Sequence, residues 1–413
     1  NQGTPPRSVA ILGAGIVGLA SAWELVQQGL EVTVVDRAAS GAGASRANGA
    51  QLSYSYVQPL ADASLWRQLP KLLLSSDSPL TLRIQADPAQ WAWGLQFLAA
   101  CRGDVSRQTT QTLLALAARS RAGFDAMVVQ TGLACDFAAT GKLVLYSDAA
   151  SFAGAQHQML LQRALGSVQE AVDAAGCVAI EPALQAHAPR IAGAIHTPSE
   201  CSADCYKVCE GLETMLRARG VRFLLNTEVT GLVTEGKRLR AAQSSAGAIE
   251  ADAFVLAMAT GSVPLARSLG IRLPVYPLKG YSVTVQAAQE RHAAPKVSVT
   301  DAARKIVFAR LGERLRIAGM AELVGNDTHI PEARIATLLA AGRAVFPQAS
   351  DYAVLDRWAG LRPATPTGLP IVGTLPGAPA NLLFNTGHGA LGFTLAFGTA
   401  QALLKPLRAT GRA

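Results

Sequence analysis

The feature that most constrains this chain is a glycine-rich turn near its start, Gly13-Ala-Gly-Ile-Val-Gly18. The turn follows a short apolar run, Ser8–Leu12, that is typical of a buried strand, and it precedes a helical pattern from Val17 to Gln28. The next run, Glu31–Asp36, predicts a second strand. Strand, turn, helix and strand in this order predict a βαβ unit on a parallel sheet.

The three glycines of this turn suit the binding of a dinucleotide. Gly13 permits the tight turn, Gly15 lets the backbone approach a pyrophosphate, and Gly18 lets the helix pack closely on the strand. The helix N-terminus would present unpaired N–H groups to the phosphates. Asp36, at the end of the second strand, can bind ribose hydroxyls and would repel a 2′-phosphate. The turn therefore predicts a dinucleotide site, although it does not separate FAD from NAD.

Elements typical of a nucleotide-binding domain are expected at both ends of the chain, and a second structural layer is expected in the sequence between them. Residues 61–145 look mostly helical, with a long pattern over Thr109–Gln130, and alternating residues from Val275 to Ile317 indicate antiparallel strands. A last helix is predicted over Leu391–Leu407. The fold class is therefore α/β (α+β overall), with a Rossmann-like domain and a discontinuous substrate domain on a mainly antiparallel sheet. The nucleotide domain is expected to comprise residues 1–60, 146–274 and 356–413, and the substrate domain residues 61–145 and 275–355.

Composition and charge exclude several classes of function. Half of the 413 residues are hydrophobic, as in packed globular proteins, and the formal net charge is +8. The basic residues are scattered without a patch interleaved with aromatic residues, so nucleic acid is not an expected partner. No apolar run is long enough to span a bilayer, because Leu60–Cys101 is broken by prolines. No signal peptide is visible. A chain of this length does not need disulfides from its six cysteines, so we expect a reduced, cytoplasmic location, with peripheral contact with the inner face of the cytoplasmic membrane left open.

The cysteines and histidines are not predicted to bind a metal. Cys201, Cys205 and Cys209 recur every four residues and would share one helix face. A clear fourth ligand and the short Cys-x-x-Cys spacing of metal sites are both missing, so small buried side chains are the favoured interpretation. The five histidines other than His388 lack partners at ligand spacing and are interpreted as structural or exposed.

Further motifs extend over nearly the whole chain. They are Ala47–Gln51, Pro274–Ser282, Gly319–Gly325, Gly360–Pro363 with Pro366–Gly373, and Asn385–Thr394. In this order they resemble the family of D-amino acid dehydrogenases (small subunit), within the wider D-amino acid oxidase and glycine oxidase superfamily. The segments Lys279-Gly-Tyr281 and Thr386-Gly-His-Gly389 are specific to this branch, whereas the N-terminal glycine turn is not.

The resemblance implies FAD bound without a covalent link. Ser45, Asn48, Gly49 and Gln51 would line the flavin near its ring. Val229, Ala259 and Gly261 would contact the adenine side. The second glycine-rich loop would hold the ribityl chain, with its helix dipole directed at flavin N1–C2=O, where charge develops on reduction. The expected cofactor-binding residues are Gly13, Gly15, Ile16, Val17, Gly18, Asp36, Arg37, Ser45, Asn48, Gly49, Ala50, Gln51, Val229, Ala259, Gly261, Arg362, Gly387, Gly389, Leu391, Gly392, Phe393 and Thr394.

Arg362 is the expected substrate-binding residue, because the Arg of this Leu-Arg-Pro motif pairs with the substrate carboxylate in the superfamily that the chain resembles. A planar guanidinium offers a bidentate clamp that Lys cannot reproduce. Tyr281 and Tyr56 are further candidates for contacts with the carboxylate or amine, although a tyrosine in a strand often serves packing alone. His388 lies between two glycines and is expected to make a hydrogen bond or steric contact at the flavin.

The expected reaction is the oxidative deamination of D-amino acids to 2-oxo acids and ammonia, with hydride transfer from Cα to flavin N5. By resemblance, a quinone or another respiratory acceptor receives the electrons. The alternatives are a D-hydroxyproline, D-proline or other secondary-amine dehydrogenase or oxidase, a nicotinamide-dependent enzyme, and a non-catalytic FAD-binding subunit of a larger complex. Thr367 stands where many relatives have an acid and Phe393 where Trp is commoner, which leaves the substrate side chain open. No motif encodes the oligomeric state.

Overall fold

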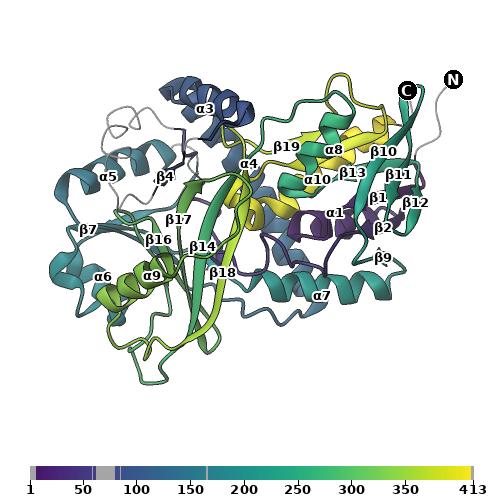
Figure 1. The fold of residues 1–413 in the computed structure, drawn as a ribbon. Helices are drawn as coiled ribbons and strands as arrows, with labels where there is room; N and C mark the ends of the chain where they lie inside the picture. The colour runs from purple at the N-terminus through teal and green to yellow at the C-terminus, as the bar shows by residue number, and fades with distance from the viewer. Residues whose placement is uncertain (1–5, 58, 62–79, 84, 164–165, 411–413) are drawn as a thin grey trace.

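Two large β-sheets organise the protein, whose computed structural model describes residues 6–57, 59–61, 80–83, 85–163 and 166–410. In Figure 1 one sheet, with helices α1 and α10, lies on the right, and the other, with helix α9, lies towards the left. The glycine turn belongs to the first sheet. The motif around Arg362 belongs to the second.

The first sheet has six strands in the order β19-β20-β13-β1-β2-β9, and all neighbours are parallel except β19 and β20. Its strands are β1 (Ser8–Leu12), β2 (Glu31–Val35), β9 (Arg222–Leu224), β13 (Ala253–Leu256), β19 (Ile371–Gly373) and β20 (Leu382–Thr386). Helix α1 (Ile16–Gln27) connects β1 to β2, so the predicted βαβ opening is confirmed. The chain extends to both sides of β1, which places a topological switch point, the usual ligand position in such sheets, at its end.

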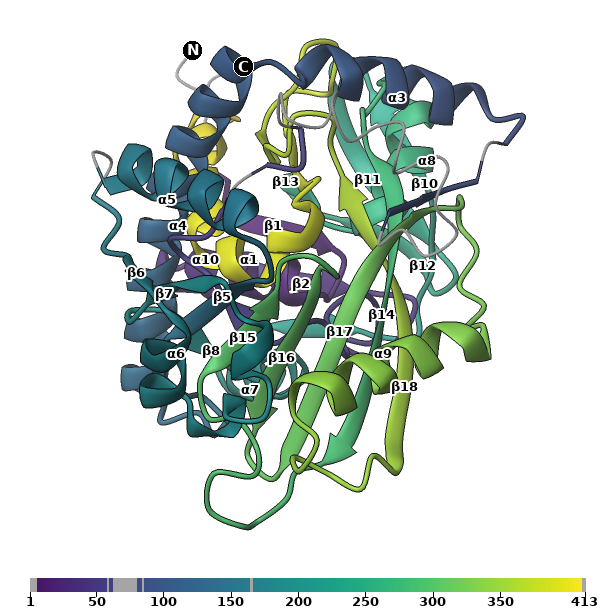
Figure 2. The same cartoon turned by 90° about the vertical axis from the view of Figure 1, so that its left-hand side faces the viewer.

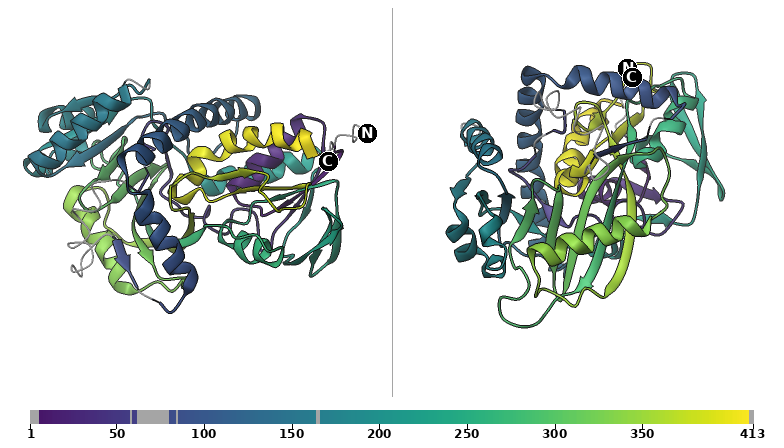
Figure 3. Two further views of the ribbon diagram at one scale, coloured as in Figure 1. Left: turned by 90° about the horizontal axis from the view of Figure 1, so that it is seen from above. Right: turned by 60° about the vertical axis from the view of Figure 1, so that its left-hand side comes forward.

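Opposite faces of this sheet are covered by different layers. On one face, Val9 and Ile11 pack with residues of α1, α4 (Gly103–Thr131), α7 (Cys205–Ala218) and α10 (Gly392–Ala409). Figure 3 shows α4 and α10 running beside each other. On the other face, Ala10 and Leu12 pack against a three-stranded antiparallel sheet and α8 (Ser262–Ser268). The strands of this small sheet are β10 (Val229–Glu235), β11 (Arg238–Ser244) and β12 (Gly247–Glu250).

The second large sheet has nine strands and is mainly antiparallel, as expected. The order is β18-β14-β17-β16-β15-β5-β7-β6, with β4 beside β17, and among the described strands only the pairs β15–β5 and β17–β4 are parallel. The strands are β4 (Leu80–Leu82), β5 (Lys142–Tyr146), β6 (Glu170–Val172), β7 (Gly193–Thr197), β14 (Tyr276–Gln286), β15 (Ser298–Asp301), β16 (Ile306–Leu311), β17 (Arg314–Leu323) and β18 (Val354–Ala364). Helix α9 (Glu332–Val345) lies across one face of it (Figure 2).

The opposite face of this nine-stranded sheet is named the inner face below. Val283, Ile317 and Leu143 pack in the α9 core, so alternate residues such as Gly280, Arg362 and Lys142 project from the inner face. The loop over residues 45–51, which comes after β2 in the chain, packs on this face. Ser282 Oγ donates to the Ala47 carbonyl at 2.6 Å, and a Cβ added to Gly49 would lie 3.1 Å from Val307 Cγ2. The inner face therefore receives the loop expected to line the flavin.

Sheet membership divides the chain differently from the expected domain ranges. Strands β6 and β7, inside 146–274, and most of β18, inside 356–413, pair into the nine-stranded sheet. Helix α4, inside 61–145, packs on α10 and contributes Phe124 to the core of the first sheet. Local patterns identify elements but not the layer on which each one packs, and the two-domain division stays a prediction.

The remaining elements surround these layers. They are α3 (Pro88–Ala100), α5 (Ala149–Arg163), α6 (Ala174–Ile180), the strand pair β3 (Gln51–Leu52) and β8 (Cys201–Ser202), and 3₁₀ turns over 182–184, 188–190, 259–261 and 389–391. Within the expected helical region, residues 62–79 lie outside the described part, and the long pattern over Thr109–Gln130 is confirmed as α4. The prediction that the three cysteines share a helix is wrong, since α7 begins at Cys205 and Cys201 lies in β8.

Candidate active site

The glycine turn adopts a geometry that only glycine allows at two positions. Gly13 has φ +116°, and a Cβ there would lie 2.4 Å from the Ala257 carbonyl oxygen at the end of β13. A Cβ on Gly18 would lie 1.9 Å from the Gly13 oxygen. At Gly15 the nearest atom would be Ser45 Oγ at 3.5 Å, so this position is not fixed by packing. Glycine at positions 13 and 18 is therefore required by the packing of the backbone, whereas glycine at position 15 leaves space above the turn.

Two side chains hold the turn in place. Asp36 accepts hydrogen bonds from the Ala14 N–H at 2.7 Å and the Ala38 N–H at 3.0 Å. Ser45 Oγ accepts the Ile16 N–H at 3.0 Å. Ser45 thus caps the first N–H of helix α1, whose N-cap residue, Gly15, has no side chain of its own. Because first-turn N–H groups have no acceptor within a helix, this end suits a phosphate.

The loop over residues 45–51 is tied to the inner face by a buried arginine. Arg316 Nη1 donates to the Asn48 carbonyl at 3.0 Å, and its Nε donates to Thr284 Oγ1 at 2.7 Å. The Asn48 side chain accepts the N–H of Ala50, which has φ +57°. Gln51 Nε2 is buried and has no hydrogen-bond partner in the described part of the protein. An amide donor in this state fits a contact with a bound cofactor.

The second glycine-rich loop is joined to the segment that follows Gln51. Gly387 has φ +79°, and a Cβ there would lie 2.7 Å from Thr365 Cγ2. Helix α10 begins at Gly392 without a side-chain cap, so its N-terminus is also available to a ligand. Thr394 Oγ1, in the first turn of α10, accepts the Ser53 N–H at 3.3 Å and connects this helix to the segment after Gln51.

Two candidates of this second loop point their side chains away from it. Phe393 packs edge-on against Phe124 of α4, so only its backbone remains for a cofactor contact. His388 Nε2 contacts Thr399 Oγ1 at 3.0 Å inside the protein. Burial lowers the pKa of His388 to about 3, and the ring is therefore neutral. The histidine positions the loop on α10, and its contact with the flavin stays a prediction.

The other cofactor candidates occupy positions around these loops. Val229 is buried at the start of β10, and Ala259 and Gly261 form a short turn after β13. Thr386 Oγ1 donates to the Ala259 carbonyl at 3.1 Å, which ties that turn to the end of β20. Arg37 is exposed. Ile16 is buried, and the half-buried candidates are Val17, Gly389, Leu391 and Gly392.

Arg362 lies across the inner face with its guanidinium over Gly280. A Cβ added to Gly280 would lie 2.2 Å from Arg362 Nη2 and 2.5 Å from its Cζ. Nη1 donates to the Met320 carbonyl at 2.9 Å. Among the described residues, no carboxylate forms an ion pair with Arg362. Burial lowers its pKa to about 10, which leaves the guanidinium charged at neutral pH.

The structure places the two tyrosine candidates in different surroundings. Tyr281 lies on the α9 face of the sheet, whereas Arg362 lies on the inner face. The Tyr281 hydroxyl donates to Glu322 Oε2 at 2.6 Å. Glu322 pairs in turn with Arg334 of α9. A strand alternates its side chains, so Tyr281, next to Gly280 in sequence, cannot share its face. The Tyr281 hydroxyl is therefore engaged on the α9 side, and the structure does not bring this residue to Arg362.

Tyr56 contacts Lys142, a residue that the sequence patterns did not indicate. The Nζ of Lys142 lies 4.4 Å from the Tyr56 ring centroid and donates to Ser53 Oγ at 2.9 Å. Lys142 projects from the inner face and is 2% exposed. Burial lowers the pKa of Lys142 to about 8, although the nearby Glu200 raises it. Neither Lys142 nor Arg316 belongs to a recognisable motif, and only the strand register could have indicated them.

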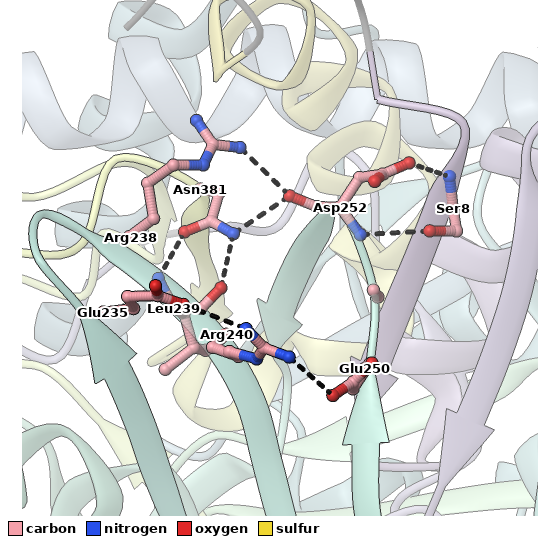
Figure 4. A pocket seen from close by; sticks show the side chains of 9 residues that line it. Ser8, Glu235, Arg238, Leu239, Arg240, Glu250, Asp252 and Asn381 are labelled. Carbon is pink, nitrogen blue, oxygen red and sulfur yellow. Dashed lines mark hydrogen bonds and ion pairs between the residues drawn. The ribbon is translucent and has the colours of Figure 1, made fainter.

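A separate surface hollow of about 650 Å³ lies at the other end of the first sheet (Figure 4). Three of its charged side chains pair with one another, since Arg240 contacts Glu235 at 3.1 Å and Glu250 at 3.7 Å. It borders Ser8, the first residue of β1, whereas the glycine turn follows the last. Because ligands of such sheets bind at the carboxyl ends of the strands, we assign this hollow no role in the active site.

The cysteines are buried as small side chains, and all six lack a disulfide. In the described ranges, no group of three or more His, Cys, Asp or Glu side chains could hold a metal ion. Within the same ranges, none of the helices combines the length and hydropathy needed to cross a bilayer.

The fold and the site define a Rossmann-type, dinucleotide-binding oxidoreductase with a separate sheet beside the nucleotide. The family model described as FAD dependent oxidoreductase matches residues 8–405. The chain belongs to this family, and FAD is its cofactor. The starts of α1 and α10, whose N-cap residues form no side-chain cap, the space above Gly15 and the unpartnered Gln51 amide fit this cofactor.

The particular branch follows from closer relatives. The chain is 47% identical to D-amino acid dehydrogenase 2 of Pseudomonas aeruginosa, covering 97% of this chain and 95% of the relative. It is 46% identical to D-amino acid dehydrogenase 2 of Ralstonia nicotianae, covering 96% and 95%. Among solved structures, glycine oxidase from Geobacillus kaustophilus matches with a TM-score of 0.76 and 21% identity, covering 98% and 95%, which shows the shared fold. The resemblance to the D-amino acid dehydrogenase family is thus confirmed.

Proposed function

We propose that this protein oxidises the Cα–N bond of D-amino acids, and that its substrate carboxylate binds Arg362. The names of the relatives at 46% and 47% identity support the substrate class. The observation that carries the proposal is the state of Arg362: a half-buried, charged guanidinium with one backbone acceptor and no carboxylate partner among the described side chains. A buried charge without a partner is costly, and a substrate carboxylate would supply that partner.

The proposed chemistry converts the amino acid to an imino acid, which water hydrolyses to a 2-oxo acid and ammonia. Bound FAD, proposed to be held without a covalent link, supplies the acceptor for the hydride that leaves Cα. Arg362 fixes the carboxylate and thereby restricts the orientation of the Cα–H bond. Lys142 contacts both Ser53 and Tyr56 and so ties the segment that follows Gln51 to the nine-stranded sheet.

We further propose that a quinone or another respiratory acceptor receives the electrons, and that the protein contacts a membrane peripherally. Support for a membrane contact comes from α3, where Trp91 is 54% exposed and Leu95 is 68% exposed. Leu82, shortly before this helix in the chain, is 42% exposed. Large apolar side chains that gather on one exposed element are typical of an interaction surface.

The experiment that tests the proposed function is an anaerobic visible spectrum of the purified holoprotein. D-alanine, D-proline and their L-enantiomers are added in turn. Bleaching of the flavin bands by D-alanine and not by L-alanine supports the proposal. Bleaching by D-proline alone would assign a secondary-amine dehydrogenase instead, and a flavin that none of them bleaches would overturn the substrate class. The same reduced protein, mixed with ubiquinone-1 or with O₂, then identifies the acceptor.

A further inference from the structure

The position of Arg362 depends on an empty space in the neighbouring strand. In the register of β14 and β18, Arg362 is opposite Leu278, and Gly280 is opposite Gly360. The guanidinium leans along the sheet until it covers Gly280, where any Cβ would overlap it. Gly280 has no positive φ and so is not required by the backbone. What requires glycine at this position is the arginine that lies on it.

An irregularity in β17 provides the hydrogen-bond acceptor for the Arg362 guanidinium. Lys279 pairs with Glu322 and Tyr281 with Gly319, so the single residue Gly280 is opposed by two residues, Met320 and Ala321. This is a β-bulge, in which one strand carries an extra residue and bends. Met320 has φ +65°, which is unusual for a residue with a side chain. Its carbonyl receives the Arg362 Nη1 hydrogen bond.

We propose that Gly280 and the Met320 bulge are positioning elements that hold Arg362 in one orientation for carboxylate binding. Gly280 provides the surface on which the guanidinium lies. The bulge turns a carbonyl towards Nη1, which leaves Nε and Nη2 for a bidentate contact. A backbone outlier beside a binding residue, held by the surrounding sheet, is typical of such preorganised sites. This inference rests on the proposed function, since it assumes that Arg362 binds the carboxylate.

The test measures how a simple carboxylate binds to the FAD-loaded enzyme. Propionate, which is D-alanine without its amine, is assayed as a competitive inhibitor of D-alanine oxidation, together with kcat, KM and flavin content. The variants are Gly280→Ala, Arg362→Ala and the double variant. Gly231→Ala is the matched control, because it also lies in a strand and its Cβ would meet nothing closer than 4.0 Å.

We expect Gly280→Ala to raise the inhibition constant of propionate and the KM of D-alanine by about 10- to 100-fold, with flavin content unchanged. The control should stay within about twofold of the wild type. In the Arg362→Ala background, adding Gly280→Ala should have almost no further effect, because the guanidinium that it displaces is gone. An equal effect in both backgrounds would indicate general distortion of the sheet and would overturn the inference.

A second pair of variants keeps the test decisive if Gly280→Ala does not fold. Met320→Gly keeps the carbonyl and tolerates positive φ, so propionate binding should stay close to that of the wild type. Met320→Val disfavours positive φ and should move the carbonyl, which weakens propionate binding. Equal inhibition constants for the two variants would refute the role of the bulge. If Arg362→Ala alone leaves propionate binding intact, the proposed carboxylate site itself fails.

Discussion

Lys142 and Ser53 are joined by a hydrogen bond of 2.9 Å, from Nζ to Oγ, inside the protein. Ser53 N–H donates to Thr394 in the first turn of α10, so this bond links the nine-stranded sheet to the helix expected to face the flavin. The ammonium contacts neutral groups at close range, the Ser53 hydroxyl and the Tyr56 ring. Glu200, whose charge raises the pKa of the lysine, uses both oxygens to accept backbone N–H groups of the neighbouring residues 54 and 55.

The first prediction concerns the pH dependence of stability that Lys142 causes. The pKa of Lys142 is about 8 in the folded protein, against an ordinary value of 10.5, because burial disfavours its charge. Between these two pH values the unfolded chain holds a proton that the folded protein has released. The folded state therefore gains stability as pH rises through this window, by up to about 3 kcal/mol.

Thermal unfolding of the holoprotein and of Lys142→Met from pH 7 to pH 10 measures this effect. We expect the Tm of the wild type to rise relative to that of the variant above pH 8, because only the wild type carries the lysine. Parallel curves over the whole range would contradict a buried lysine with a lowered pKa. The other titratable or charged groups of this region are the same in both proteins: Glu200, Tyr54, Tyr56, Tyr146 and Arg121.

The second prediction concerns acid stability and His388. The pKa of His388 is about 3 in the folded protein because the ring is buried, against 6.5 for an exposed ring. Below pH 6.5 the unfolded chain takes up a proton that the folded protein does not. Stability is thus lost as pH falls, by about 2 kcal/mol at pH 5. His388→Gln cannot take up this proton, so the Tm difference between the two proteins should shift in favour of the variant from pH 7 to pH 5. A constant difference would show that the folded protein protonates this ring as easily as the unfolded chain does.

The third prediction separates the roles of two glycines in the N-terminal turn. Gly15→Ala is tolerated by the protein atoms, since its Cβ would meet Ser45 Oγ only at 3.5 Å, but the methyl group occupies the space expected for the pyrophosphate. We expect a folded protein that loses at least about 10-fold in FAD affinity. Gly18→Ala clashes with the Gly13 carbonyl and should lower the Tm of the apoprotein itself. Circular dichroism and FAD titration distinguish the two; a yellow, fully loaded Gly15→Ala protein would contradict the assignment.

The fourth prediction concerns α3 and a lipid surface. Trp91→Ser combined with Leu95→Ser removes two exposed apolar side chains and should reduce flotation with vesicles of phosphatidylglycerol and phosphatidylethanolamine several-fold. Val129→Ser on α4 is the control, because Val129 is 85% exposed but lies on another helix. Flavin reduction by D-alanine should not change in either variant. Equal flotation of all three proteins would rule out α3 as the contact.

Local sequence patterns were sufficient for the nucleotide half of the site. Sequence spacing alone predicts the roles of Gly13, Gly18 and Asp36, because the turn, the helix start and the strand end lie within one short segment. The antiparallel character of β14, β16 and β17 also followed from alternation of residue types. The arginine of the Leu-Arg-Pro motif was identified by its resemblance to a family, and its isolation from carboxylates became visible only in the folded protein.

Only the tertiary structure decided which residues share the inner face. Tyr281 and Gly280 are neighbours in the chain, yet the alternation of the strand sends the tyrosine to α9 and leaves the glycine under Arg362. Lys142 contacts Ser53, in the segment that follows Gln51, from a strand that is distant in sequence. The sequence by itself determined the dinucleotide-binding turn and the family. The strand register and a bulge at Met320, which depend on long-range pairing, decided how the surroundings of Arg362 are built.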